Sequence, residues 1–532
     1  MKQFLYIFLL FGALTCFAQP KHEVRAVWLT TIGGIDWPST YAHDGMGIEA
    51  QKRQLCNMLD RLKKAGVNTV MLQTRVRATT IYPSDLEPWD GCLSGKPGVS
   101  PGYDALQTAI DECHRRGMEL HAWVVTIPVG KWNTYGCKRI RQRYPSLIMK
   151  IGDEGYMNPE AYGTVDYLTN ICQEITERYD IDGIHLDYIR YPETWRGRMS
   201  ADNITRIVRA ISARVKFFKP WVKMSCSPIG KYDDLSRYRS NGWNARRRVA
   251  QDAQSWLREG LMDQLYPMMY FQGNNFYPFA IDWQENSYGR TIVSGLGIYM
   301  LDPKEGRFQL SEIKRQLNVT RQIGVGHCYF RAKFLLDNIK GVLDYVTWFD
   351  RYPALIPPMT WAQSIAPTAP TTLKVRHTKQ GDQLSWSGAK DRSDGPYLLY
   401  NIYASREKPV DTSNPANLIA THYLWQSLQV PHTATASHFF HYAVTALDRY
   451  GNESEAVQEP TVKPSVNPER QPLTPITKDE IHGESNTRYR PRHEHHGLWR
   501  HQGKRQQGRD GDDGRDRLAQ VWRRLSEAGP YL

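Results

Sequence analysis

The feature that most constrains the fold is the regular alternation of short apolar runs with amphipathic segments between residues 24 and 358. In residues 49–65, for example, apolar side chains recur at helical spacing and Gly66 follows as a stop signal. The predicted strands are residues 24–31, 69–73, 118–125, 181–187, 222–227, 263–270, 291–299 and 325–330, and the predicted helices are residues 49–65, 104–116, 165–179, 202–218, 249–259, 311–323 and 335–349. This α/β pattern predicts a (β/α)8 TIM barrel over residues 22–358, with enlarged loops.

A doubly wound open sheet is the alternative fold for an alternating pattern. Such a sheet usually carries a glycine-rich phosphate turn directly after its first strand. Here residues 31–38 read TIGGIDWP, which lacks the GxGxxG spacing and does not lead straight into a helix. The barrel is therefore the favoured prediction.

The pattern changes after a proline-rich linker at residues 357–370. Short strand-like runs with polar turns predict an all-β sandwich over residues 366–463. Trp386 and the segments 400–403 and 442–451 resemble those of a fibronectin type III domain, which usually binds or spaces. Residues 464–532 are poor in apolar side chains, and we expect them to form a disordered tail. The histidines at 493–496 could bind a metal adventitiously, but a solvated tail is the favoured interpretation.

The amino terminus has the pattern of a secretory signal peptide. Lys2 precedes an apolar run at residues 4–14, and small residues lie near Ala18, so we expect residues 1–18 to be removed. Cys16 raises lipidation as a less favoured alternative. No later stretch is apolar for long enough to span a bilayer. The sequence thus predicts an exported protein, periplasmic or secreted, with association with the cell surface as a further option.

Charge and cysteine content narrow the range of partners and cofactors. The net charge of +13 is spread along the chain without a nucleic-acid-binding motif, so nucleic acid is not an expected partner and a polysaccharide is. Seven cysteines follow Cys16 without paired spacing, and we interpret them mainly as buried small apolar residues, with one disulfide left open. The sequence shows no metal-ligand spacing, P-loop or GxSxG elbow, and it predicts no cofactor and no metal.

Asp187 is the first candidate for a catalytic carboxylate. It ends the apolar run 181–187 and begins a polar and aromatic burst, and the active groups of a barrel follow its strand ends. The plainer alternative is an ion pair with Arg190 that only orders a loop.

Glu87 is the second candidate, in the long loop after the second strand. Its neighbours Leu86, Pro88 and Trp89 offer an apolar setting that suits a general acid. An exposed loop acid is an equally weighted alternative. Weaker competitors are Asp85, Asp302 and Glu160.

The remaining strand ends are rich in aromatic and polar side chains. Flat rings that stack on sugars, together with two carboxylates, are what glycoside hydrolysis requires. This pattern predicts an enzyme, a glycoside hydrolase, in which Glu87 is the acid/base and Asp187 the nucleophile or electrostatic stabiliser. Non-catalytic glycan binding and an esterase that pairs Asp187 with a histidine are the alternatives. His121 and His185 alternate with apolar residues and are more typical of core histidines than of ligands.

The motifs at 24–28, 73–75, 82–84, 87–89, 101–104, 121–123, 158–159, 182–192, 227–230 and 295–299 resemble, as an ordered set, the glycosyl-hydrolase-like 10 family, also called the DUF187 family. The resemblance implies a TIM barrel and an exported bacterial glycosidase that acts on peptidoglycan glycan strands. It implies Asp187 and Glu87 as acidic positions. Together with the aromatic strand ends, it gives the predicted substrate-binding residues Arg75, Tyr82, Trp89, His121, Trp123, Asn158, Arg190, Tyr270 and Tyr299. Residues 76–80 depart from the family, which commonly has a Pro and an Asp in this loop.

Overall fold

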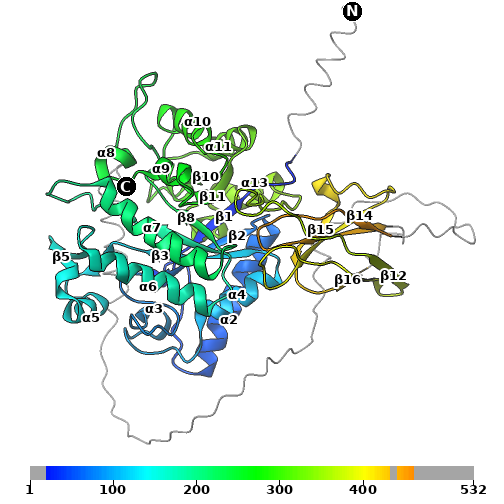
Figure 1. Cartoon of the computed structure of the whole chain (residues 1–532), viewed down its shortest axis with the longest axis horizontal. Coiled ribbons are helices and arrows are strands. Elements are labelled where there is room, and N and C mark those ends of the chain that lie inside the picture. Colours follow the sequence, from blue (N-terminus) through cyan, green and yellow to red (C-terminus); the bar gives the residue numbers. More distant parts are fainter. Residues whose placement is uncertain (1–18, 432–439, 460–532) are drawn as a thin grey trace, which may run out of the picture.

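The computed structural model describes residues 19–431 and 440–459. Eight parallel strands close into a barrel in the order β1-β11-β10-β9-β8-β7-β3-β2 (Figure 1). Their bounds are β1 Arg25–Leu29, β2 Thr69–Arg75, β3 Glu119–Val125, β7 Gly183–Asp187, β8 Lys223–Cys226, β9 Gln264–Leu265, β10 Thr291–Leu296 and β11 Gly326–Tyr329. The predicted (β/α)8 barrel is thereby confirmed.

Helices surround the barrel and bury their apolar faces against it (Figure 1). The expected start of α4 is confirmed, because the Asp104 carboxylate accepts a hydrogen bond from the Gln107 N–H. The helices are α2 Gly45–Lys64, α3 Gly91–Ser94, α4 Ala105–Arg115, α5 Tyr135–Arg143, α6 Tyr162–Arg178, α7 Ala201–Phe218, α8 Ala245–Val249, α9 Ala253–Arg258, α10 Tyr277–Glu285, α11 Leu310–Gln322, α12 Ala332–Leu336 and α13 Val342–Phe349.

Two predicted helices are each split in two. The helix expected at 249–259 is interrupted by Ala250, and the one expected at 335–349 by Asn338 and Lys340, all with positive φ. The predicted strand 263–270 shrinks to the two residues of β9, because Pro267 cannot donate a ladder hydrogen bond. These differences change the lengths of the elements and leave the barrel order intact.

The long loop expected after the third strand contains a small antiparallel sheet. It consists of β4 Pro128–Lys131, β5 Ile148–Ile151 and β6 Glu154–Met157 in the order β4-β6-β5. Thr126, two residues before β4, donates its N–H and its hydroxyl to the carbonyl of Asp187, at 2.9 and 2.8 Å. The small sheet therefore starts beside the end of β7, at the carboxyl-terminal end of the barrel.

Two further antiparallel sheets follow the linker and face each other across an apolar core that includes Trp386, Tyr400 and Tyr442. One sheet has the order β12-β13-β16 and the other β15-β14-β17-β18. The strands are β12 Thr372–Thr378, β13 Gly381–Ser387, β14 Leu399–Ser405, β15 Leu418–Tyr423, β16 Ser427–Pro431, β17 His441–Leu447 and β18 Val457–Gln458. An all-β region after the barrel was expected, and its likeness to fibronectin type III stays a prediction.

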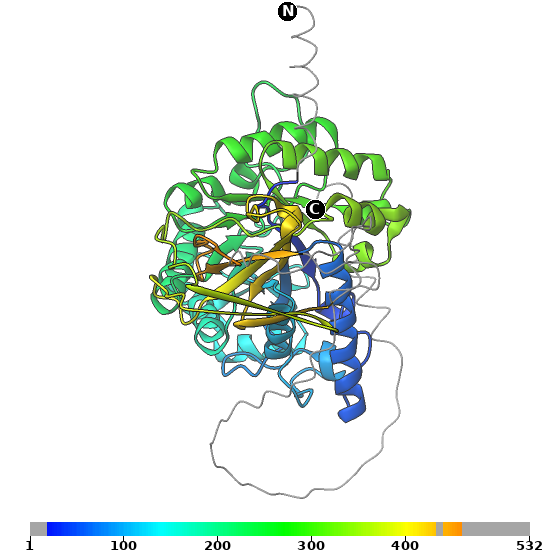
Figure 2. The same cartoon turned by 90° about the vertical axis from the view of Figure 1, so that its right-hand side faces the viewer.

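This sandwich packs against the amino-terminal end of the barrel (Figure 2). Arg449 donates hydrogen bonds to Asp180 at 2.8 Å and to Asp182, which precedes β7, at 3.1 Å. Trp361 of the linker donates to Asp263, which precedes β9, at 2.8 Å. The opposite, carboxyl-terminal end of the barrel is left to the loops that follow the strands.

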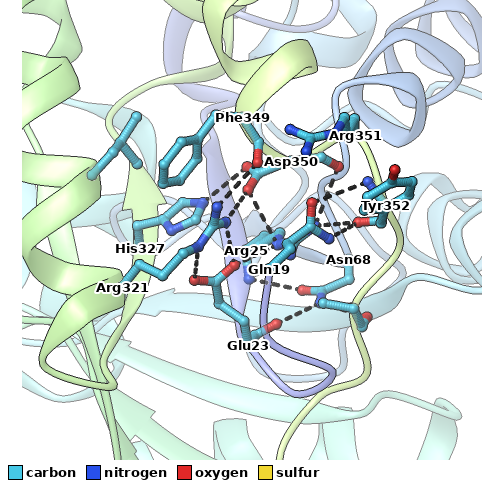
Figure 3. Close-up of polar contacts among 12 residues, drawn as sticks. Gln19, Glu23, Arg25, Asn68, Arg321, His327, Phe349, Asp350, Arg351 and Tyr352 are labelled. Atoms are coloured by element: carbon cyan, nitrogen blue, oxygen red, sulfur yellow. Dashed lines mark hydrogen bonds and ion pairs between the residues drawn. The ribbon is translucent and has the colours of Figure 1, made fainter. Parts of the chain in front are cut away.

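A network of buried charges also closes the amino-terminal end (Figure 3). Arg321 pairs with Glu23 at 2.6 Å and with Asp350 at 2.5 Å, and Arg25 pairs with the same two carboxylates at 2.7 and 3.3 Å. His327 lies 3.1 Å from Asp350. Glu23, His327 and Asp350 have the geometry of a metal-ligand triad. Two guanidinium groups already neutralise the two carboxylates, however, so we interpret the network as structural.

Three further sequence predictions concern the cysteines, membrane-spanning segments and the two ends of the chain. The seven cysteines in the described residues are free. Six of them are buried, which confirms the interpretation as core residues for those six, and Cys56 is only half-buried. No helix among the residues that the structure describes is long and apolar enough to cross a membrane. The predicted signal peptide at 1–18 and the predicted tail at 464–532 lie outside the described residues.

Candidate active site

Asp187 is the last residue of β7 and lies at the carboxyl-terminal mouth of the barrel. Its carboxylate accepts hydrogen bonds from the Trp123 indole at 3.0 Å, the Ser227 hydroxyl at 2.7 Å and the Tyr188 N–H at 2.9 Å. Burial raises the pKa of Asp187, and these donors together with the charge of Arg190 offset only part of that rise. A buried carboxyl with a raised pKa at a barrel mouth is typical of a reactive group.

Tyr188 turns the chain away from the strand immediately after Asp187. Its φ of 52° is a left-handed conformation that is uncommon for a bulky residue and is often found at functional sites. Burial raises its pKa to about 12, with Glu193 as the next cause. The Arg190 guanidinium lies 4.6 Å from the centre of the Tyr188 ring and pairs with Glu193 at 2.9 Å.

Aromatic rings form the rest of the mouth. Tyr270 stacks on Phe330 with ring centres 5.2 Å apart, and Tyr299 meets both rings edge-on at 5.7 and 5.8 Å. Burial raises the pKa of Tyr270 well above its usual value, and the charge of Asp187 contributes to that rise, which links this aromatic group to the carboxylate. Ring faces beside a carboxylate suit a sugar, whose apolar faces stack on aromatic side chains.

Glu87 is not among the groups that contact Asp187. Its carboxylate pairs with Arg75 at 2.6 Å and accepts a hydrogen bond from the Tyr167 hydroxyl at 3.0 Å. Glu87 lines a cavity of about 410 Å³ between the loop after β2, α5 and α6, and neither Asp187 nor Trp123 lines that cavity. The apolar and aromatic neighbours at residues 86–89 suggested a general acid, but Glu87 forms an ion pair with Arg75, twelve residues earlier. The acid role of Glu87 stays a prediction, and these contacts do not favour it.

Four of the predicted substrate-binding side chains bind groups other than the Asp187 carboxylate. Arg75 is fully buried and also donates to the carbonyls of Val125 and Thr126. Tyr82 is fully buried and donates to Glu174 at 2.9 Å. His121 lies 3.0 Å from Glu119, in the amino-terminal half of β3, as a core histidine does.

Asn158 accepts a hydrogen bond from the N–H of Glu160 and so shapes the turn before α6. Trp89 is partly buried against the barrel core. The predicted residues that the structure brings together at the mouth are Asp187, Trp123, Arg190, Tyr270 and Tyr299.

Sequence reasoning missed part of the polar side of the mouth. Glu154 and Tyr156 lie on β6, and the β4-β6 pairing sets Tyr156 opposite Pro128 next to the end of β3. Arg77, from the loop after β2, lies 3.9 Å from Glu154. The signal that could have revealed this strand is the alternation of polar and apolar residues at 154–157, soon after the turn-forming glycine at 152. This segment was predicted only as a loop.

These observations define a class of protein. The family model described as glycosyl hydrolase-like 10 matches residues 23–200 and 192–296, which together exceed half of the chain. The chain therefore belongs to the glycosyl hydrolase-like 10 family, and it is a glycoside hydrolase.

Individual relatives are similar to the chain over different lengths. It is 29% identical over 499 residues to the glycosyl hydrolase YngK of Bacillus subtilis (strain 168), covering 84% of this chain and 94% of that protein. It is 27% identical over 292 residues to the glycosyl hydrolase DigH of Escherichia coli (strain K12), covering 48% of this chain and 66% of that protein. Among solved structures, the PgaB (BpsB) glycoside hydrolase domain from Bordetella bronchiseptica is matched with a TM-score of 0.42 and 12% identity, over 61% of this chain and 98% of that one.

Proposed function

We propose that this glycoside hydrolase is exported and cleaves the glycan strands of peptidoglycan, with Asp187 as its essential carboxylate. The observation that carries the proposal is the setting of Asp187 at the barrel mouth, buried, with a raised pKa and ringed by aromatic side chains. The substrate follows from what the family resemblance implies, and export follows from the signal-like residues 1–18.

The hydrogen bonds of Asp187 suit a carboxylate that keeps its negative charge available for the reaction. Ser227 and Trp123 are neutral donors that hold the carboxylate in one orientation without neutralising it. When the glycosidic bond breaks, the anomeric carbon gains positive charge, and a carboxylate beside it stabilises or captures that carbon. A low-dielectric site strengthens this interaction in the transition state.

Tyr270, Tyr299 and Phe330 would bind the sugar on the other side of the mouth. Their rings pack against one another, so each holds the next in place. A pre-arranged aromatic surface lowers the cost of ordering a saccharide on binding. In this proposal, the reaction takes place on the β7 side of the mouth, and the sugar rings bind on the β9–β11 side.

The substrate is tested with purified peptidoglycan, supplied intact and also after removal of its peptides. Release of reducing sugars by the wild-type enzyme and its loss in Asp187→Asn would support the proposal. Turnover of other polysaccharides, with no product from either peptidoglycan preparation, would refute the substrate. Full activity of Asp187→Asn on any glycan would refute the site.

Export is tested separately by expressing the whole chain and sequencing the amino terminus of the mature protein. A start after Ala18, in the periplasm or the medium, is expected. An intact Met1 in the cytoplasm would contradict the proposal.

A further inference from the structure

Glycoside hydrolysis usually needs a proton donor in addition to the carboxylate beside the anomeric carbon. Several acids at this end of the barrel have other partners. Glu87 pairs with Arg75, and Asp36 is held by Arg331 together with the N–H and hydroxyl of Thr30. A carboxylate that is occupied in this way has little freedom to meet a glycosidic oxygen.

Two other acids lie beside the tyrosines of the mouth. Burial raises the pKa of Tyr156 to about 12, and the negative charges of Glu154 and Glu193 are the next two causes. Both carboxylates therefore lie within electrostatic range of one phenol. Glu193 and Asp187 act in the same way on Tyr188, which links the group around Tyr156 to the reactive carboxylate.

The small antiparallel sheet carries Glu154 and Tyr156 together on one strand. β6 pairs with β4, with Glu154 opposite Lys131 and Tyr156 opposite Pro128. Glu154 and Tyr156 are two residues apart on one strand, so their side chains point to the same face of the sheet. β4 begins two residues after Thr126, whose N–H and hydroxyl bind the Asp187 carbonyl.

Glu154 and Glu193 differ in how firmly they are held. Glu193 pairs with Arg190 at 2.9 Å. Burial raises the pKa of Glu193, but the charge of Arg190 and hydrogen bonds outweigh burial and bring this pKa below its usual value. Glu154 lies 3.9 Å from Arg77, beyond hydrogen-bond distance, and its side chain is 23% exposed. Burial and the nearby charge of Asp153 raise the pKa of Glu154, while the cations Arg77 and Lys131 oppose the rise.

We infer that Glu154 is the proton donor of the Asp187 site, in place of Glu87. The inference rests on the proposed role of Asp187. The proton of Glu154 moves to the glycosidic oxygen as the bond from that oxygen to the anomeric carbon breaks and the oxygen keeps the electron pair. Water then supplies a hydroxyl group to the anomeric carbon and gives up one proton to a carboxylate, so each cleavage consumes one water molecule.

The test compares two substrates with different needs for protonation. Peptidoglycan strands without peptides have a sugar hydroxyl as a poor leaving group that needs a proton. In a dinitrophenyl glycoside of a chito-oligosaccharide, the dinitrophenolate leaves without one. Because general acid catalysis contributes about 10²–10⁴-fold, Glu154→Gln should lower kcat/KM on the strands by on the order of 100-fold or more. It should leave the activated glycoside within about tenfold of wild type, since protonation no longer limits that reaction.

Glu160→Gln is the matched control, because Glu160 is an exposed acid of the same insertion. The inference is overturned if Glu154→Gln keeps wild-type activity on the strands, or if both substrates lose activity equally. Asp187→Asn should lose activity on both substrates. If it does not, the proposed catalytic role of Asp187 has failed, whatever the result for Glu154.

A second measurement keeps Glu154 itself and does not depend on the Gln variant. Arg77→Met removes the nearest cation that opposes protonation of Glu154. If Glu154 is the donor, the alkaline limb of the kcat/KM profile moves to higher pH in Arg77→Met. An unmoved alkaline limb would contradict the assignment.

Discussion

At the amino-terminal end of the barrel Glu23, Asp350 and Asp182 all lie against arginine or histidine side chains, whereas at the carboxyl-terminal end Asp187 lies against neutral donors and rings. All of these carboxylates are buried, and burial raises the pKa of each. Cations nevertheless bring the pKa of Glu23, Asp350 and Asp182 below the usual value, while the pKa of Asp187 stays above it. Burial alone therefore does not distinguish a structural carboxylate from a reactive one; the charge of its partners does.

The largest effect is expected for Asp187→Asn, at the carboxyl-terminal end of the barrel. We expect kcat/KM to fall by about 10³-fold or more, the order lost when a nucleophile or charge stabiliser is removed. The folded protein should be as stable as wild type or more stable at pH 7, because the charge that is removed was unfavourably buried. Activity assays and thermal unfolding check the two halves of the prediction, and a large loss of stability would place Asp187 with the structural acids.

At the other end, Arg25→Met should leave two buried carboxylates short of a partner. Removal of one member of a buried ion pair costs about 3–5 kcal/mol, and Arg25 is fully buried between Glu23 and Asp350. Denaturant unfolding measures the loss. The residual folded enzyme should keep its kcat, because Arg25 lies at the end away from the mouth. A variant as stable as wild type would show that the network is not structural.

Glu87→Gln sharpens the comparison, since Glu87 lies near the mouth but has a structural partner. We expect a loss of about 3–5 kcal/mol in stability, as for other buried pairs, and a smaller loss of activity than in Glu154→Gln when both are assayed well below their Tm. If Glu87→Gln loses activity on glycan strands but not stability, Glu87 is the acid after all.

The two ends should also respond to pH with opposite sign. The depressed pKa values of Glu23, Asp350 and Asp182 contribute stability that is present above their unfolded values, near pH 4, and is lost as pH falls through the folded values. Asp187, with its raised pKa, contributes stability below its unfolded value that is lost as pH rises through its folded value. Free energies of unfolding of wild type and Asp187→Asn between pH 3 and 7 should therefore converge toward low pH. A parallel pair of curves would contradict this prediction.

The smallest expected effect is that of Asp85→Asn. Asp85 is 80% exposed and pairs with Arg178 on the surface. Surface pairs contribute about 0–1 kcal/mol, so both Tm and kcat should stay close to wild type. A clear loss of activity would restore Asp85 as a competitor for the acid.

The sequence predicted the barrel and the place of Asp187 at a strand end because both depend on local pattern. An apolar run of strand length that ends in polar residues is visible in residues 181–191, and Trp123 lies near the end of the neighbouring strand. Glu87 shows the limit of such reasoning, because the ion pair that occupies it depends on how a loop folds back onto Arg75. The alternating neighbours of His121 favoured a core histidine, and only the family resemblance made it a substrate-binding residue; its contact with Glu119 agrees with the pattern. Glu154 was missed because the short strands of its sheet are read as a loop until the chain is folded.

The contact between sandwich and barrel limits how the chain can be dissected. Asp182 and Asp263 at the base of the barrel take part of their hydrogen bonding from Arg449 and Trp361, which lie beyond residue 358. An expression fragment that stops at the end of the barrel would leave these acids facing water without those donors and would uncover the apolar residues beneath them. A truncated catalytic fragment should therefore keep residues 359–459, even though the proposed active site lies at the far end.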